Sequence, residues 1–207
     1  DSAELAELLG IFMGDGHLSK YQASMTTNSK TDREHALFTK KLIENLFKVQ
    51  ATIKEKRGEN AVNVVVSSKA LVKFLIKKGM PFGNKIRNGL AVPEWIKRNN
   101  IYKKSFLRGL FDTDGCIYTD VHRSGGNVYN HLGWTITSYA HKLTSDVLEI
   151  LKNLGFSPTH RETQKSIYIR KQEEIARYFT EIGTNNLKHH SRYKKFVEGY
   201  RSGHNGA

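Results

Sequence analysis

Two Asp-Gly pairs, Asp15-Gly16 and Asp114-Gly115, each close an apolar run that is typical of a helix, and they recur 99 residues apart. Glycine commonly ends a helix, but aspartate is unfavourable there because the helix dipole already places negative charge at that end. If the two helices pair in parallel, the carboxylates also repel each other, by about 3 kcal/mol at ~5 Å. Divalent cations would offset both costs, and carboxylate oxygens suit Mg²⁺. The two pairs together predict a metal site, although each alone is typical of a plain turn.

The helices that carry these aspartates have small residues at a four-residue spacing. The first contains Gly10 and Gly14, and the second contains Gly109 and Thr113 at the same places. Such a stripe lets the backbone of another helix come close, whereas an isolated glycine inside a helix costs roughly 1 kcal/mol. We therefore expect the two helices to pack on each other about a pseudo-two-fold axis. Ordinary core helices with tolerated glycines are the alternative.

Several further segments recur in the same order in the two halves of the chain. The matching pairs are residues 8–16 and 107–115, residues 42–46 and 150–154, and residues 78–85 and 182–188. The chain is therefore predicted to consist of two copies of one unit, residues 1–100 and residues 101–207. Each unit is expected to run helix, hairpin, helix, hairpin, helix, which is an α+β fold.

Local signals place some of these elements. Thr31 and Glu34 form a capping-box pattern that predicts the start of a helix. Residues 50–57 and 61–67 are predicted strands, the second with alternating valines that would face the core. The first hairpin of the second unit is predicted to be longer than its counterpart, and a last helix is predicted at roughly residues 189–199.

The charge of the chain indicates a polyanionic partner. Lysine and arginine total 33 against 20 acidic residues, which gives a net charge of +13 and a pI near 9.7. Residues 1–100 carry 17 basic and 10 acidic side chains, and residues 101–207 carry 16 and 10, so the charge is not a tail. DNA, RNA or an acidic membrane surface would fit, and a protein that is merely basic is the alternative.

Composition also excludes several classes of protein. The one cysteine, Cys116, excludes a disulfide framework and a zinc site built from cysteines. No apolar run approaches the roughly 18 residues of a membrane span, and no leader peptide is visible. We therefore expect an intracellular protein that works at nucleic acid, in a prokaryotic cytoplasm or an organelle.

Residues 8–16 and 107–115 resemble the paired motif of the LAGLIDADG homing endonucleases, in the single-chain form with two motifs. The resemblance covers essentially the whole chain in order, charge and repeat. It implies two tandem αββαββα units that are joined by the motif helices, with a saddle of two antiparallel sheets on DNA. It also implies a monomer, because the repeat supplies both halves of the two-fold within one chain.

The resemblance further implies that the last aspartate of each motif, Asp15 and Asp114, binds the catalytic divalent metals. Gly14 and Thr113, the residues before them, are expected to complete the metal site, with Mg²⁺, Mn²⁺ or Ca²⁺ as the ion. The first motif departs from the family pattern at Met13, where an acid is usual. Because that position is not the family's main metal ligand, we do not expect Met13 to abolish activity.

Phosphodiester hydrolysis also needs an activated water and stabilisation of the leaving oxygen. Lys85 and Lys188 resemble the basic companion residues of the family, because each follows a matching glycine-containing segment in its unit. A solvated surface lysine is the alternative at either position. Lys30 is a competing candidate in the first unit, and its counterpart falls near Ser138-Tyr139.

Contacts to DNA are expected from alternate positions of the strands and from nearby turns, since polar side chains there can reach base edges and phosphates. In the first unit these are Ser19, Lys20, Gln22, Ser24, Thr26, Lys30, Lys54, Lys56 and Asn63. In the second unit they are Tyr118, Asp120, His122, Arg123, Thr135, Arg161, Thr163, Tyr168 and Arg170. A solvent-facing polar position is the alternative for each single residue.

Together these features predict a monomeric, site-specific endonuclease that cuts both strands of double-stranded DNA with a divalent cation, at a long asymmetric target. The resemblance implies cuts across the minor groove that leave short 3′ overhangs. Two alternatives share the fold: an RNA maturase, and a non-catalytic DNA-binding regulator. Neither a membrane nor an obligate protein partner is expected.

Overall fold

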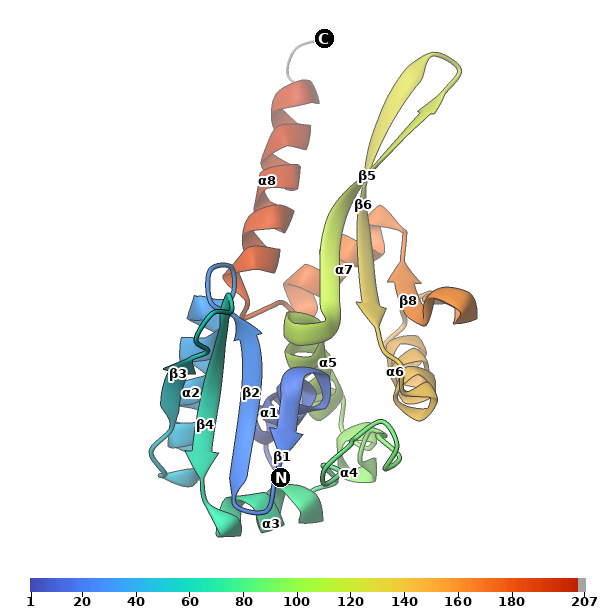
Figure 1. The fold of residues 1–207 in the computed structure, drawn as a ribbon. Coiled ribbons are helices and arrows are strands. Elements are labelled where there is room, and N and C mark those ends of the chain that lie inside the picture. Colours follow the sequence, from blue (N-terminus) through green and yellow to red (C-terminus); the bar gives the residue numbers. More distant parts are fainter. Residues whose placement is uncertain (205–207) are drawn as a thin grey trace.

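Two four-stranded antiparallel sheets flank a central pair of helices, α1 and α5, in the computed structural model (Figure 1). The structure describes residues 1–204, without the side chains of His122, Ser124, Asn127, Gln164 and residues 200–204. The helices are α1 (Ala3–Asp15), α2 (Arg33–Phe47), α3 (Lys69–Lys77), α4 (Glu94–Lys97), α5 (Asn100–Asp114), α6 (His141–Asn153), α7 (Gln172–Glu181) and α8 (Leu187–His204).

The two sheets repeat one strand order. The first runs β1-β2-β4-β3 and the second runs β5-β6-β8-β7. The strands are β1 (Gly16–Leu18), β2 (Gln22–Asn28), β3 (Thr52–Glu55), β4 (Ala61–Ser67), β5 (Gly115–Ser124), β6 (Asn127–Thr137), β7 (Thr159–Arg161) and β8 (Ser166–Ile169). The 3₁₀ turn η1 (Glu162–Gln164) joins β7 to β8. This arrangement confirms the predicted α+β fold with a repeated antiparallel unit.

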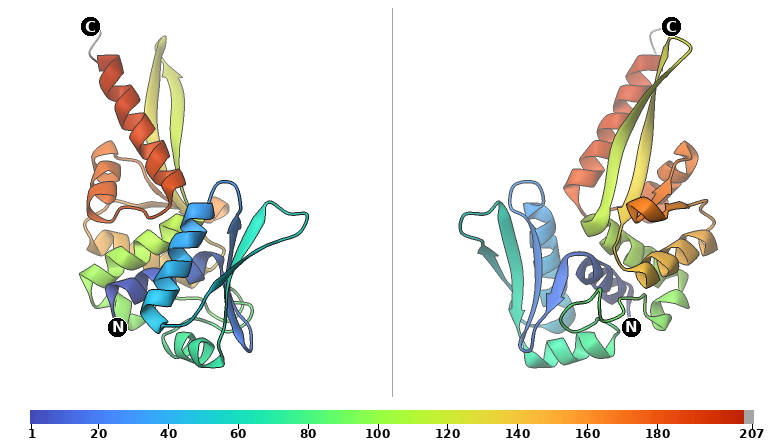
Figure 2. Two further views of the ribbon diagram at one scale, coloured as in Figure 1. Left: turned by 90° about the vertical axis from the view of Figure 1, so that its left-hand side faces the viewer. Right: turned by 45° about the vertical axis from the view of Figure 1, so that its right-hand side comes forward.

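Each sheet buries one face against helices and leaves the other face polar. In the first sheet Val62, Val64 and Val66 are buried on the side that α2 and α3 cover (Figure 2). In the second sheet Trp134 and Ile167 are buried in the same way. The alternation along the strands that the sequence predicts is therefore present, because apolar and polar residues alternate with the pleat.

Helices α1 and α5 touch at the level of the backbone. A Cβ atom at Gly10 would clash with the carbonyl oxygen of Phe106, and one at Gly109 would lie 3.0 Å from the backbone nitrogen of Ile11. A Cβ atom at Gly14 would lie 2.8 Å from the Cβ of Thr113. The small residues of both motifs therefore allow this helix pair to form, as the sequence predicts.

The glycines that end these helices act differently from a usual helix stop. Gly16 has φ −82° and ψ 156°, which is ordinary extended backbone. A Cβ atom there would lie 2.6 Å from the carbonyl oxygen of Phe12, and one at Gly115 would clash with the ring and the carbonyl oxygen of Phe111. Glycine is required because the chain turns straight from helix into strand over the preceding turn.

The predicted capping box is wrong. Helix α2 begins at Arg33 after Asp32, and the Thr31 hydroxyl donates to a carboxylate oxygen of Asp32 at 2.6 Å instead of capping the helix. The predicted strand 50–57 is shorter, Thr52–Glu55. The last helix is longer than predicted, Leu187–His204, and its Tyr193 stacks on Phe179 of α7 with ring centroids 4.1 Å apart.

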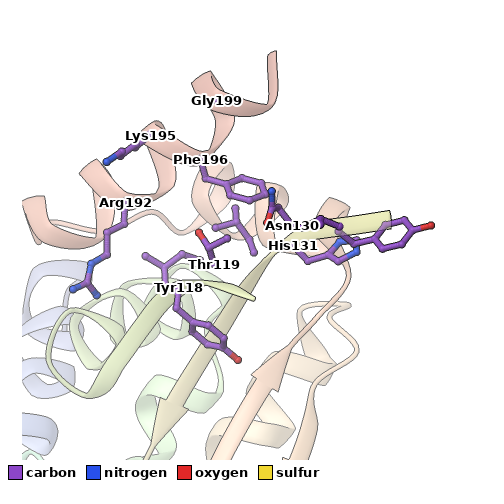
Figure 3. A pocket seen from close by; sticks show the side chains of 12 residues that line it. Tyr118, Thr119, Asn130, His131, Arg192, Lys195, Phe196 and Gly199 are labelled. Atoms are coloured by element: carbon purple, nitrogen blue, oxygen red, sulfur yellow. The ribbon is translucent and has the colours of Figure 1, made fainter. Parts of the chain in front are cut away.

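Helix α8 and the β5–β6 hairpin project side by side from the same end of the molecule (Figures 1 and 2). A groove lies between them, and Arg192 and Phe196 of α8 and Thr119 of β5 are among the residues that line it (Figure 3). The predicted longer hairpin is present: β5 has 10 residues and β6 has 11. Within residues 1–204, no helix combines the length and apolar character needed to cross a membrane.

Candidate metal centre and nucleic-acid interface

Asp15 and Asp114 are the last residues of the paired helices α1 and α5, so the helix contact brings the two carboxylates into one site. Burial, and then the charge of Asp15, raise the pKa of Asp114 to about 7. Burial also raises the pKa of Asp15, although the charge of Lys85 opposes this. Two desolvated carboxylates that act on each other form a site with unbalanced negative charge.

The ammonium group of Lys85 lies at the end of α1. It donates to the carbonyl oxygens of Phe12 at 3.3 Å and Gly16 at 3.1 Å, and also to that of Gly14. Burial lowers the pKa of Lys85, and the charges of Asp114 and then Asp15 oppose that shift. Lys85 is therefore brought to both carboxylates, whereas Lys30 lies in the exposed turn after β2.

The donor set at the helix ends fits a hard divalent cation. Within the described residues, neither the Asp15 nor the Asp114 carboxylate accepts a hydrogen bond, so their oxygens are available as ligands. The Thr113 hydroxyl donates back into its own helix, to the carbonyl oxygens of Leu110 at 3.0 Å and Gly109 at 3.3 Å. The backbone carbonyls of Gly14 and Thr113 are further oxygens at the two helix ends, and that of Gly14 also accepts the Lys85 ammonium.

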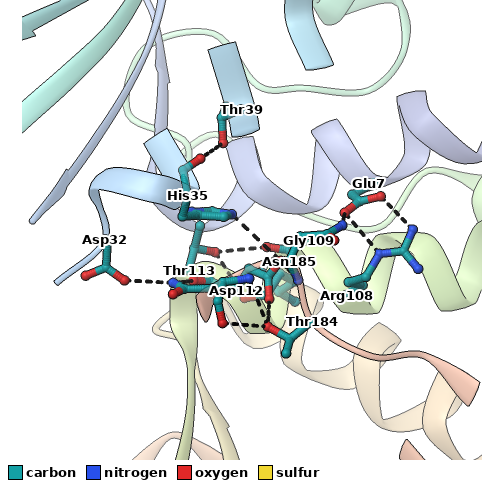
Figure 4. A network of polar contacts seen from close by, with 12 residues as sticks. Glu7, Asp32, His35, Thr39, Arg108, Gly109, Asp112, Thr113, Thr184 and Asn185 are labelled. Atoms are coloured by element: carbon teal, nitrogen blue, oxygen red, sulfur yellow. Dashed lines mark hydrogen bonds and ion pairs between the residues drawn. The ribbon is translucent and has the colours of Figure 1, made fainter. Parts of the chain in front are cut away.

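Lys188 does not mirror Lys85. Its ammonium lies 2.7 Å from a carboxylate oxygen of Asp32, in the first unit. The residues just before it, 184–186, form a polar network with side chains of the helices. Thr184 contacts Asp112 of α5, Asn185 contacts Glu7 of α1, and Asn186 contacts Asp32, which precedes α2 (Figure 4). The sequence predicted equivalent lysines, and the difference arises because the loops that carry them are held by different partners.

Asp112 anchors the loop that leads to Lys188. Its carboxylate accepts the Thr184 hydroxyl and, at 2.9 Å, the backbone N–H of Asn185. Burial raises the pKa of Asp112 to about 7, and the ring nitrogen Nε2 of His35 lies 3.7 Å from it. The acid of the second motif therefore holds a loop, whereas Met13 at the equivalent position of the first motif is buried in the core.

The first sheet brings most of its predicted DNA-binding residues onto one face. Thr26 lies opposite Asn63, which lies opposite Lys54, and Thr26 donates to the Asn63 side chain at 2.5 Å. Gln22 and Ser24 share this face through the alternation of β2. The remaining predicted residues lie in turns: Ser19 and Lys20 between β1 and β2, Lys30 after β2, and Lys56 after β3.

The second sheet repeats this arrangement. Thr135 lies opposite Tyr168, and Tyr168 lies opposite Thr159. The Tyr168 ring lies between two guanidinium groups, that of Arg170 at 4.9 Å and that of Arg161 at 5.7 Å from its centroid. Such stacking holds cationic groups at fixed places on the polar face.

Other predicted residues of the second sheet lie along the hairpin. Asp120 approaches Arg170 at 3.9 Å, and the Tyr118 ring lies over Gly133, where a Cβ atom would clash with it. Arg123 is exposed near the hairpin tip, and the side chain of His122 lies outside the described part of the structure. Thr163 lies in η1, so its expected strand position is wrong.

The register adds polar residues that the sequence analysis missed. His17 lies opposite Ser24, and Ser67 accepts a hydrogen bond from Gln22 at 3.1 Å. His131 lies opposite Asp120 on the hairpin. Alternation along one strand does not indicate positions on its neighbours, so only the strand register shows that these residues face Ser24, Gln22 and Asp120.

Comparisons with known proteins agree with this geometry. The family model described as a LAGLIDADG-like domain matches residues 2–79 and 102–183. The tRNA-splicing ligase RtcB of Methanopyrus kandleri is 26% identical over 204 residues, which cover 86% of this chain and 20% of that protein. The chain thus spans a fifth of the length of this curated relative.

Two solved structures are similar in fold. The complex of I-DmoI with DNA and Mn has a TM-score of 0.57 and 18% identity, covering 87% of this chain and 96% of that one. The LAGLIDADG meganuclease I-AabMI bound to uncleaved DNA has a TM-score of 0.64 and 13% identity, covering 95% and 91%. Since the family model matches both repeats, and the fold and paired motif agree, this chain belongs to the LAGLIDADG-like domain family.

Proposed function

We propose that this protein is a site-specific endonuclease that hydrolyses both strands of double-stranded DNA with a divalent cation. The observation that carries the proposal is the pair of desolvated carboxylates, Asp15 and Asp114, at adjoining helix ends between two polar sheet faces. A non-catalytic binding protein has no need of two acids beside DNA, because they repel phosphates. The net charge of +13 offsets that repulsion elsewhere on the surface.

Asp15 and Asp114, with the carbonyls of Gly14 and Thr113, would hold the cation, which is Mg²⁺ or a substitute such as Mn²⁺ or Ca²⁺. When bound, the cation supplies an acidified water and stabilises negative charge on the phosphate. The carboxylates keep the cation beside the scissile phosphate. Lys85 is held at the carbonyls of α1 with a lowered pKa, so it can exchange a proton with the water network. Lys188, which is held by the Asp32 carboxylate instead of by carbonyls, would be the basic residue for the other strand.

The two polar faces would lie along the DNA and read it. The longest strands have 7 residues in the first sheet and 11 in the second, so at ~3.3 Å per residue the two faces cover about 59 Å, or at least about 15 base pairs. The different side chains of the two faces make the target asymmetric. The protein would act as a monomer on intracellular DNA, and it would leave short 3′ overhangs.

A plasmid-cleavage assay tests the proposal. A library of candidate sites is incubated with the protein with and without Mg²⁺, and linear product is expected only with the ion. Asp15→Asn and Asp114→Asn should each abolish double-strand cleavage while DNA binding survives, because each removes a metal ligand and no contact to bases. Glu94→Gln, which removes an exposed carboxylate from α4, outside the predicted metal and DNA-binding residues, is the matched control and should still cut.

The results separate the proposal from its alternatives. Tight DNA binding without cleavage under any metal would indicate a regulator of the same fold. Preferential binding to structured RNA would indicate a maturase. Wild-type cutting by either motif variant would show that the carboxylates are not the metal ligands.

A further inference from the structure

Lys188 is held by a residue of the other unit. Its ammonium lies 2.7 Å from Asp32, whose side chain is only 6% exposed. Asp32 precedes the first residue of α2, where the helix dipole favours a negative charge. The two residues come from opposite halves of the chain, so their contact exists only when both units are assembled.

The Asp32 carboxylate is itself fixed by three groups. It accepts the Thr31 hydroxyl at 2.6 Å, the Asn186 side-chain amide at 2.7 Å and the Lys188 ammonium at 2.7 Å. The same Asn186 amide also donates to the backbone carbonyl of Asp112 at 2.9 Å. Although burial would raise it, these partners hold the pKa of Asp32 below its usual value, so the carboxylate stays ionised.

The pair lies beside the end of α5 that carries Asp114. The Asn186 amide that contacts Asp32 also donates to the carbonyl of Asp112, two residues before Asp114 in the same helix. Placing a third carboxylate near two others is unfavourable by itself. The presence of Asp32 at this place is explained if its carboxylate orients a lysine of the site. Lys188 is the lysine that it contacts.

Lys85 has no equivalent carboxylate partner among the described residues. Its ammonium is fixed by backbone carbonyls of its own unit. The two lysines thus reach the site by different means, one through the end of α1 and one through an ion pair between units. A change at Asp32 should therefore affect the surroundings of Lys188 and leave those of Lys85 intact.

We infer that Asp32 is a positioning residue that orients Lys188 for the hydrolysis of one of the two DNA strands. The inference rests on the proposed function. The first unit contributes the carboxylate and the second contributes the lysine, so one strand's chemistry depends on a contact between units. The chemistry of the other strand, attended by Lys85, does not depend on that contact.

Single-turnover cleavage of a duplex with a different label on each strand tests the inference. Asp32→Asn keeps the size of the side chain and an acceptor for Thr31, but it loses the charge that holds Lys188. We expect one strand to be cut at least about tenfold more slowly while the other keeps its rate, since small displacements of a catalytic group can cost up to about 100-fold. On supercoiled plasmid, nicked circles should accumulate.

Two further variants define the partner. Lys188→Met should slow the same strand, and the double variant Asp32→Asn with Lys188→Met should be no slower than Lys188→Met alone, because both changes remove one interaction. Asp32→Glu keeps the charge and shifts it by one methylene. It should reduce the cleavage rate of the same strand by less than Asp32→Asn does. It replaces Asp32→Asn as the test if that variant does not fold.

Asp146→Asn is the matched control. Asp146 is also buried and ion-paired, with Lys97 at 2.8 Å and Lys142 at 3.0 Å, but it lies on α6. Its loss should not change the ratio of the two strand rates, even if the melting temperature falls.

The inference is overturned if Asp32→Asn leaves both rates unchanged or slows both strands equally, which is the pattern of a purely structural residue. It is also overturned if the effects of Asp32→Asn and Lys188→Met multiply in the double variant. A wild-type protein that cuts neither strand of any target would instead overturn the proposed function, and this inference with it.

Discussion

Gly10 and Gly109 face the opposite helix at places where no side chain fits. A Cβ atom at Gly10 would lie 2.8 Å from the backbone nitrogen of Leu110, and one at Gly109 would lie 3.0 Å from the carbonyl carbon of Glu7. The separation of the helices is therefore set by these two residues. Because Asp15 and Asp114 end the same helices, the distance between the two carboxylates depends on it as well.

Gly10→Ala should destabilise the protein, although alanine is normally preferred to glycine inside a helix by roughly 0.5–1 kcal/mol. The clash is with backbone, which cannot rotate away, so we expect a loss of at least about 1–3 kcal/mol in the free energy of unfolding. Urea unfolding measures it. Gly199→Ala is the control, since a Cβ atom there would meet no described atom within 4 Å. An unchanged Gly10→Ala midpoint would contradict the packing.

The binding of a divalent cation should depend on pH through Asp114. Its pKa of about 7 means that protons compete with the metal at neutral pH. We therefore expect the affinity for Mn²⁺ to rise as pH increases through about 7 and to level off above it. Calorimetric titration of the DNA complex at several pH values measures this. A pH-independent affinity would show that Asp114 is not a ligand.

The same shift makes the metal-free protein less stable at higher pH. The folded pKa of Asp114 lies above its ordinary value of 3.8, so its contribution to stability is fully present below 3.8 and is lost as pH rises through about 7. Asp114→Asn removes this contribution. The stability of Asp114→Asn relative to wild type should thus improve from about pH 5 to pH 8, as measured by urea unfolding in chelator.

His189 should limit stability in acid. Both of its ring nitrogens are buried without a hydrogen-bond partner among the described residues, and its ring lies 4.8 Å from that of Phe111. Burial, and then the charge of Lys188, lower its pKa to about 3 from 6.5. The contribution of neutral His189 to the free energy of unfolding is fully present above pH 6.5. It is lost as pH falls towards about 3, because the unfolded chain then binds a proton that the folded protein does not.

His189→Phe keeps the ring contact and removes the titrating group. Its acid-unfolding midpoint should therefore lie at lower pH than that of the wild type, as followed by tryptophan fluorescence. His190→Phe changes the exposed neighbour and serves as the control. Equal midpoints for wild type and His189→Phe would show that protonation of this histidine does not drive unfolding.

The sequence was sufficient for features that depend on local pattern. The two motifs were visible because both copies keep small residues and an Asp-Gly end, and the valines of β4 were visible through strict alternation. The role of Asp112 and the pairing of Asp32 with Lys188 were not visible, because each joins segments that are far apart in the chain. The capping box at Thr31 failed for the same reason: Asp32 is held by partners from the second unit.

The β5–β6 hairpin should make the DNA footprint asymmetric. It has strands of 10 and 11 residues, whereas β1 and β2 have 3 and 7. At ~3.3 Å per residue the longer hairpin reaches about 33 Å, against about 23 Å for its counterpart. The second unit should therefore protect more base pairs than the first when hydroxyl-radical footprinting is centred on the cleavage position.

Shortening the hairpin tests the same relationship directly. Residues 121–130 can be replaced by Asn-Gly, which closes a two-residue turn while keeping the pair Asp120 and His131 in register. The change removes four residues of reach from β5, or about 13 Å, so protection should shrink by about 4 base pairs. The loss should occur only on the side of the second unit, because the first sheet is untouched. A footprint that is symmetric in the wild type, or that shrinks on both sides in the variant, would show that the hairpin does not lie along the DNA.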